Sequence, residues 1–298
     1  MDFEVIIIGG SYAGLSAATS LGRALRKVLV IDGGKPCNRQ TPYSHNFLTN
    51  DGETPSAIIH KATEQLQAYK TVTLLSDTVI DGAKSENGFE LVTLSGQIYI
   101  APKLLFATGI TDVMPSIAGF AECWGISVLH CPYCHGYEVK HQPTGILGNG
   151  EAIFEYVKLI NNWTKDITLF TNGKATLTDE QLQELRTKKI KIEEANVRHI
   201  VHEGGKIKSI MLQDDCAYNI TALYARLPFT QHCNLPQQLG CEITDEGYIH
   251  VDSFYRASIP GIYAAGDNIA LMRSVATAVA AGTATGAIIN RDLVIEEF

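Results

Sequence analysis

The sequence predicts an α/β fold with two domains, the second inserted into the first. A chain of 298 residues is too long for one ordinary hydrophobic core but is a comfortable length for two domains. A pattern of strand, glycine-rich turn, helix and strand begins the chain and starts again near residue 144. Near the C-terminus, the segment 261–267 and the helix expected after it return to the first pattern. We therefore expect one domain built from 1–114 and 229–298, and a second built from 115–228.

The composition is that of a globular protein and excludes one class of partner. Apolar residues make up 45% of the chain and charged residues 19%, and the formal net charge is −8. We do not expect nucleic acid to be a partner, because phosphate binding needs a concentrated basic face. We see neither a secretory signal nor an apolar stretch of about 18 residues, so we expect no membrane partner and a cytoplasmic location.

The first glycine-rich turn has the features of a dinucleotide site. The apolar run Glu4–Ile8 leads into Gly9-Gly10-Ser11-Tyr12-Ala13-Gly14, a helix is expected to about Arg23, and the next apolar run ends at Asp32. Glycines in the pattern G-x-G-x-x-G let a pyrophosphate approach a helix N-terminus, and an acid after the second strand binds a ribose. Ser11 replaces the middle glycine. A plain tight turn is the alternative, and the strands, the helix and Asp32 favour nucleotide binding.

Short strands and a second unit of the same kind are expected in the middle of the chain. Hairpin-like strands fill about Thr71 to Phe106, with turns at Asp81-Gly82 and Asn87-Gly88. The small residues Ala107-Thr108-Gly109 then let the backbone approach a ligand. The second unit has the following expected parts: a strand from about Thr144, the loop Gly148-Asn149-Gly150, a helix over 152–161, and strands at Ile167–Phe170, Lys188–Ile192 and Ile207–Leu212.

A second candidate ligand corner lies near the C-terminus, at Gly266-Asp267. Asp267 follows an apolar strand and precedes a helix that Ser274 is expected to cap. An acid at this position can bind a polyol hydroxyl, and the helix N-terminus can stabilise negative charge on a reduced flavin. A plain strand-to-helix turn is the alternative interpretation.

The sequence Cys131-Pro132-Tyr133-Cys134 is the strongest chemical signal. Two cysteines at this spacing close a short disulfide and reopen by thiol exchange, and the neighbouring His135 can transfer protons. Zinc is one alternative, because His130 and His135 are also ligand types. However, a structural zinc site usually has a second pair of ligands, and no second C-x-x-C motif exists. Two unreactive cysteines are the other alternative, and the redox interpretation is favoured over both. The other five cysteines are scattered, so no disulfide framework and no metal are expected.

Taken together and in this order, these motifs resemble the low-molecular-weight thioredoxin reductase family of flavoproteins. The stretch Cys131–Glu138, with the first glycine-rich turn, resembles a divergent branch that includes dithiol oxidases similar to gliotoxin oxidase. The resemblance implies two Rossmann-like, three-layer ββα domains, FAD as cofactor and a homodimer. It also implies that Cys134 contacts the flavin, that Cys131 attacks the substrate disulfide and that His135 replaces the family's aspartate acid. FAD is expected at Gly9, Ser11, Gly14, Asp32, Thr108, Gly109, Gly266, Asp267, Arg273 and Ser274.

The second glycine-rich loop departs from the family pattern. Ile153 stands where a small residue packs helix against strand, and Thr171-Asn172-Gly173 stands where arginines bind the 2′-phosphate of NADPH. Only Lys174 is basic there, and no acid is placed to hold the ribose of NADH. A domain can keep its fold after it has lost its ligand, so an empty nucleotide pocket is the alternative interpretation. The electron donor therefore stays open between NADPH, NADH and another carrier.

The predicted function is FAD-dependent thiol–disulfide oxidoreduction. The expected partners are a thioredoxin-like protein disulfide or a small-molecule dithiol or disulfide. One alternative is an oxygen-using dithiol oxidase that runs the same chemistry backwards. The other is a flavin redox sensor without turnover.

Overall fold

The structure is a computed structural model that describes residues 3–298. It confirms the predicted α/β class, because helices alternate with strands that form two parallel sheets. The chain forms two compact units. The first unit contains the chain up to Arg39, Asn46–Thr111 and Phe229–Phe298, and the second contains Gln40–His45 and Asp112–Pro228.

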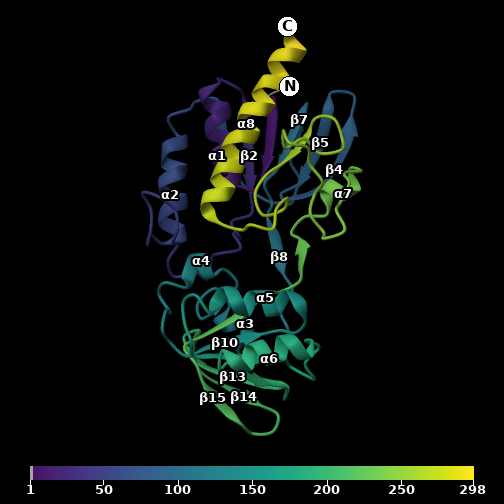
Figure 1. The fold of residues 1–298 in the computed structure, drawn as a ribbon. Helices are drawn as coiled ribbons and strands as arrows, with labels where there is room; N and C mark the ends of the chain where they lie inside the picture. The colour runs from purple at the N-terminus through teal and green to yellow at the C-terminus, as the bar shows by residue number, and fades with distance from the viewer. Residues whose placement is uncertain (1–2) are drawn as a thin grey trace. The chain divides into compact units, whose positions relative to one another are not determined.

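The first unit is built on a five-stranded parallel sheet in the order β18-β7-β1-β2-β3 (Figure 1). Both faces of its central strand are covered: Val5 and Ile7 pack into one apolar cluster, and Ile6 and Ile8 pack into another. Burial on both faces explains why these strands are continuous apolar runs. The bounds are β1 Val5–Ile8, β2 Val28–Asp32, β3 Val72–Ser76, β7 Lys103–Phe106 and β18 Ile262–Ala264.

Helices α1 (Tyr12–Arg23) and α8 (Val275–Glu297) lie side by side in this unit (Figure 1). Small residues allow a very close contact between them. A β-carbon at Gly282 would lie 2.1 Å from the carbonyl oxygen of Ala13, and one at Gly286 would lie 2.6 Å from that of Ala17. The start of α1, where the first glycine-rich turn ends, is therefore fixed by backbone packing.

A three-stranded sheet contains β4 (Val79–Ser85), β5 (Gly88–Thr93) and β6 (Ile98–Ala101). The predicted turn at Asn87-Gly88 is confirmed, because the chain reverses there between β4 and β5. The predicted turn at Asp81-Gly82 is wrong, because both residues lie inside β4, next to a register shift between Val79 and Asp81. A β-carbon at Gly82 would lie 2.7 Å from Cδ2 of Leu91, so this glycine serves close packing rather than a reversal.

The second unit contains a second five-stranded parallel sheet in the order β12-β11-β10-β16-β9 and the smaller antiparallel sheet β13-β14-β15. The predicted strand at Lys188–Ile192 begins later than expected, because helix α6 is C-capped at Lys188 and Lys189 has a positive φ of 59°. The bounds are β9 Val128–Leu129, β10 Thr144–Leu147, α5 Glu151–Ile160, β11 Ile167–Phe170, α6 Asp179–Thr187, β12 Lys191–Glu193, β13 Val197–Glu203, β14 Lys206–Leu212, β15 Ala217–Asn219 and β16 Ala222–Ala225.

The remaining elements are short connections and one surface helix. Strands β8 and β17 pair with each other where the chain passes between the units. In the part of the chain that the structure describes, no helix is long and apolar enough to cross a bilayer. The bounds are α2 Pro55–Leu66, β8 Ile110–Asp112, α3 Phe120–Cys123, α4 Pro132–His135, β17 Phe229–Gln231 and α7 Leu235–Gln238.

Candidate functional site

The glycine-rich turn of the first unit closes tightly between β1 and α1. Gly9 has a φ of +105°, and a β-carbon there would lie 2.3 Å from the carbonyl oxygen of Ala107. A β-carbon at Gly14 would lie 1.8 Å from the carbonyl oxygen of Gly9. Both positions therefore require glycine, one for its backbone angle and the other for the approach of helix to turn. This is the geometry that brings a pyrophosphate onto a helix N-terminus.

Ser11 and Asp32 lie on either side of this turn. Ser11 is the N-cap of α1, and within residues 3–298 its side chain caps no backbone N–H group. These N–H groups are therefore directed at whatever lies before the helix. The carboxylate of Asp32 accepts hydrogen bonds from the backbone N–H of Gly10 at 2.9 Å and of Gly34 at 3.2 Å. These bonds orient the carboxylate at the end of β2, and its remaining acceptor positions suit ribose hydroxyls.

Two buried oxygens at the same edge of the sheet lack protein partners. Among the described residues, no group forms a hydrogen bond with the hydroxyl of Thr108 or with the side-chain oxygen of Asn268. Asn268 is fully buried, and its amide nitrogen donates to the carbonyl oxygen of Phe106 at 2.8 Å. Gly109 has a φ of +65°, and a β-carbon there would have no described atom within 4 Å. Buried polar atoms rarely stay unpaired, so these oxygens point to a polar ligand.

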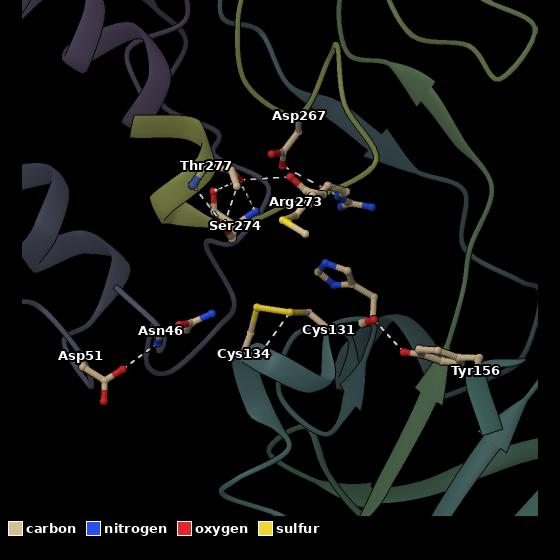
Figure 2. Close-up of a disulfide and its surroundings, with 11 residues drawn as sticks. Asn46, Asp51, Cys131, Cys134, Tyr156, Asp267, Arg273, Ser274 and Thr277 are labelled. Carbon is tan, nitrogen blue, oxygen red and sulfur yellow. Dashed lines mark hydrogen bonds and ion pairs between the residues drawn. A yellow bond between two sulfur atoms is a disulfide. The ribbon is translucent and has the colours of Figure 1, made fainter. Parts of the chain in front are cut away.

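The C-terminal corner at Gly266-Asp267 contributes a carboxylate that lies near two other side chains. Gly266 has a φ of +97°, and Asp267 follows it after β18. The Asp267 carboxylate lies 3.8 Å from the Nε of Arg273 (Figure 2). It also lies 3.8 Å from the thiol of Cys37. The predicted cap at Ser274 is confirmed: its hydroxyl accepts from the backbone N–H of Thr277 at 3.1 Å. The sequence did not indicate Cys37, because its contact with Asp267 spans 230 positions of the chain.

The first unit thus brings all ten predicted FAD residues to the carboxyl ends of β1, β2, β7 and β18 and the starts of α1 and α8. Tight glycines, a helix start, oriented carboxylates and buried oxygens without protein partners together fit a dinucleotide. Asn268 lies at the same edge of the sheet, and the sequence does not indicate it, because an asparagine after Gly-Asp carries no signal of its own.

The second unit carries the predicted cysteine pair. Cys131 and Cys134 form a disulfide with a Cα–Cα distance of 5.3 Å (Figure 2). Cys131 is the N-cap of α4, and its sulfur accepts a hydrogen bond from the backbone N–H of Cys134 at 3.1 Å. Pro132 occupies the first turn of α4, where its lack of an N–H group costs nothing. When the disulfide opens, the N–H of Cys134 is positioned to stabilise a thiolate at Cys131.

His135 is the proton-transfer candidate next to the pair. Burial, with a smaller contribution from His45, lowers the pKa of His135 from 6.5 to about 4. The side chain is therefore a neutral imidazole near pH 7 and can accept a proton. His45 in turn lies 3.6 Å from the carboxylate of Glu138, both within the second unit. The sequence indicated His135 by its position but not His45, which is distant along the chain.

Two aromatic residues that the sequence did not indicate contact the segment 130–136, which contains the cysteine pair. The hydroxyl of Tyr156, on α5, donates to the carbonyl oxygen of His130 at 2.6 Å (Figure 2). Trp163 packs on Gly136, where a β-carbon would lie 2.9 Å from the indole. Trp163 also meets the ring of Tyr133 edge-on at 5.5 Å. Both aromatic residues act through contacts distant in sequence, so no local pattern could have revealed them.

Known proteins resemble this chain over nearly its whole length. A family model described as pyridine nucleotide-disulphide oxidoreductase matches residues 3–282. The chain belongs to this family. It is 32% identical to the thioredoxin reductase tcpT of Claviceps purpurea over 98% of this chain and 95% of that protein. It also resembles two solved structures. One is the TrxB protein of Bacillus anthracis, with a TM-score of 0.95, 32% identity and coverage of 99% of this chain and 100% of that chain. The other is HlmI, with a TM-score of 0.93, 30% identity and coverage of 99% and 93%.

This pyridine nucleotide-disulphide oxidoreductase is an enzyme of the thioredoxin reductase type, and its cofactor is FAD. The family, the fold class and the general activity predicted from the sequence are thereby confirmed. FAD exchanges an electron pair with a dithiol or a disulfide, which is the chemistry that a C-x-x-C pair needs.

Proposed function

We propose that this enzyme exchanges electrons between FAD and an external disulfide through Cys131 and Cys134. The proposal includes the FAD residues identified above, with the pyrophosphate at Gly9, Ser11 and Gly14, and the ribityl chain at Asp267. It also includes the domain limits 1–114, 115–228 and 229–298, a homodimer and a cytoplasmic location. The observation that carries it is the disulfide whose first sulfur accepts the N–H of the second cysteine.

In the reductive direction, the thiolate of Cys131 attacks a substrate disulfide. A sulfur–sulfur bond forms between Cys131 and the substrate while the substrate's own disulfide breaks, and the leaving thiolate takes a proton. Cys134 then attacks the sulfur of Cys131, the second substrate thiolate leaves and takes a second proton, and the Cys131–Cys134 disulfide is restored. The substrate gains two electrons and two protons, and the enzyme dithiol loses them. The names of the relatives support a thioredoxin-like protein or a small disulfide as the substrate.

Four further cysteines support a location in a reducing compartment. Among the described residues they form no disulfide, and they are Cys123, Cys216, Cys233 and Cys241. Proteins of oxidising compartments usually pair their cysteines, whereas cytosolic thiols stay reduced.

The state of His135 favours a second candidate function, the oxidation of a dithiol by dioxygen. With a pKa of about 4, His135 is a neutral imidazole near pH 7 and holds no proton that it can readily give to a leaving substrate thiolate, as the reductive direction requires. The overall reaction would convert a dithiol and O₂ into a disulfide and H₂O₂. Equal molar yields of peroxide and substrate disulfide in air would identify this direction.

A donor-independent experiment tests the proposed function. The flavin of the purified enzyme is reduced with dithionite without oxygen, and a disulfide such as oxidised thioredoxin is then added. We expect the flavin absorption to return within seconds, and to stay bleached in Cys131→Ser. Equal recovery in the wild type and in Cys131→Ser would contradict the role of the cysteine pair.

A further inference from the structure

We infer that the second dinucleotide-type fold of this enzyme does not bind NADPH. Side chains of the protein itself occupy the hydrogen-bonding groups that would otherwise bind the phosphates of NADPH. The inference deepens the proposed function, on which it rests, since it restricts which donor can supply the flavin. It concerns the loop Gly148-Asn149-Gly150, the start of α5 and the segment 171–176 after β11.

The side chain of Asn149 forms hydrogen bonds that connect the glycine-rich loop to the segment after β11. Its side-chain oxygen accepts hydrogen bonds from the backbone N–H of Gly150 at 2.9 Å and of Thr176 at 2.8 Å, and contacts the Thr176 hydroxyl at 3.0 Å. Its amide nitrogen donates to the carbonyl oxygen of Lys174 at 2.8 Å. One side chain therefore joins the two segments between which a bound dinucleotide would place its adenosine ribose and pyrophosphate.

The backbone donor that a pyrophosphate needs is already engaged. A pyrophosphate on this fold is held by N–H groups of the glycine-rich loop and the helix start. The N–H of Gly150, the N-cap of α5, donates instead to the side-chain oxygen of Asn149. Ile153 also fills space here, because a β-carbon at Gly148 would lie 2.6 Å from its Cδ1 atom.

The segment after β11 offers no built site for a 2′-phosphate. Thr171 donates its hydroxyl to the carbonyl oxygen of Gly173 at 2.7 Å, and Asn172 accepts from the backbone N–H of Val197 at 2.8 Å. The hydroxyl of Thr171 and the side-chain oxygen of Asn172 are thus engaged within the protein. Lys174 is the one basic residue in 171–176, and its side chain is a single exposed cation rather than an arginine fork.

The charges around this loop oppose a phosphate. Glu151 lies in the first turn of α5, where the helix dipole favours an anion, and Gln181 donates a hydrogen bond to its carboxylate. Glu194 accepts the backbone N–H of Ala175 at 2.7 Å. Two carboxylates therefore use donors that would otherwise serve the phosphates, and both repel a dianionic group.

Equilibrium binding to the flavin-loaded full-length enzyme tests the inference. We expect NADPH, followed by calorimetry, to show a dissociation constant above about 1 mM, and to leave the flavin absorption unchanged without oxygen. A micromolar dissociation constant for NADPH would overturn the inference. A micromolar dissociation constant for NADH would also contradict the inference, because NADH carries the same pyrophosphate and lacks only the 2′-phosphate. Bleaching of the flavin by dithiothreitol in the same preparation tests the proposed function separately, so the two can fail independently.

A pair of variants tests the role of Asn149. Thr176→Arg adds a cation beside the loop, and Asn149→Gly with Thr176→Arg also frees the N–H of Gly150. We expect the double variant to bind NADPH at least about tenfold more tightly than Thr176→Arg alone, as expected for a recovered charge-assisted hydrogen bond. Equal affinities in the two variants would contradict the role given to Asn149.

Discussion

The two glycine-rich loops of this enzyme each lead from a strand into a helix, but they direct their polar groups differently. The loop at Gly9–Gly14 leaves the helix start of α1 uncapped by Ser11, among the described residues, and lies beside the oriented carboxylate of Asp32. The loop at Gly148–Gly150 has its own asparagine as the hydrogen-bond partner. A glycine pattern therefore shows that a backbone turn is possible, whereas the partners of its N–H groups show whether a ligand can use it.

The largest expected effect comes from adding a methyl group to the first loop. Gly14→Ala places a β-carbon 1.8 Å from the carbonyl oxygen of Gly9, which forces α1 away from the turn. We expect FAD affinity to fall by about 100-fold, measured by flavin fluorescence during reconstitution. The matched change Gly148→Ala also strains the backbone, at a φ of +148°, and meets Ile153 at 2.6 Å. It does so in the second unit, so this variant should load FAD like the wild type. Equal FAD loss in both variants would contradict the difference between the loops.

A smaller effect is expected from removing the charge at the C-terminal corner of the first unit. Asp267→Asn keeps the shape of the side chain but removes the anion that lies near Arg273. We expect FAD to bind about tenfold more weakly, as for one lost charge-assisted hydrogen bond. The exposed Asp245→Asn in the same unit serves as the control and should leave the affinity unchanged. An unchanged FAD affinity in Asp267→Asn would show that the charge of this residue does not contribute to FAD binding.

In the second unit, His135 is expected to make stability depend on pH. Its pKa is about 4 in the folded enzyme and 6.5 in the unfolded chain, so the unfolded chain binds more protons between these values. Its contribution is complete above pH 6.5 and is lost as the pH falls through 4, with a total of up to about 3 kcal/mol. Urea unfolding from pH 4 to 7 should therefore show a flatter pH profile for His135→Gln than for the wild type. Parallel profiles would contradict the lowered pKa.

The smallest effect is expected at the support of the cysteine segment. Tyr156→Phe removes the hydrogen bond from its hydroxyl to the carbonyl oxygen of His130. We expect the free energy of unfolding to fall by about 1 kcal/mol, because the part-buried carbonyl loses this hydrogen bond. Tyr137 is 71% exposed, so Tyr137→Phe should change stability by less than about 0.5 kcal/mol. If the two substitutions had the same effect, Tyr156 would not support the segment before Cys131.

The sequence was sufficient for the features that local spacing determines. The strand before Gly9, the cap at Ser274 and the pair Cys131–Cys134 each follow from neighbours a few residues apart, and the structure has all three. The wrong turn at Asp81-Gly82 has a physical reason, since a glycine can serve close packing against Leu91 as well as a reversal.

Features that depend on distant contacts could not be predicted. Asn149 looks like any loop residue until its bonds to Lys174 and Thr176 are known. The segment Gln40–His45 groups with the second unit through contacts such as that of Gln40 with the carbonyl oxygen of Ala121, 81 positions away. The departures at Ile153 and Thr171 did indicate an altered nucleotide site, but only the hydrogen bonds show what closes it.

Anaerobic reduction of the flavin by a dithiol tests the central claim most directly, namely that FAD exchanges electrons with Cys131 and Cys134. The flavin absorption is followed after dithiothreitol is added to the wild type, to Cys131→Ser and to Cys134→Ser. We expect rapid bleaching in the wild type and a rate at least about 100-fold lower in both variants, because each lacks the disulfide through which the electrons pass. Bleaching at the wild-type rate in either variant would contradict the claim.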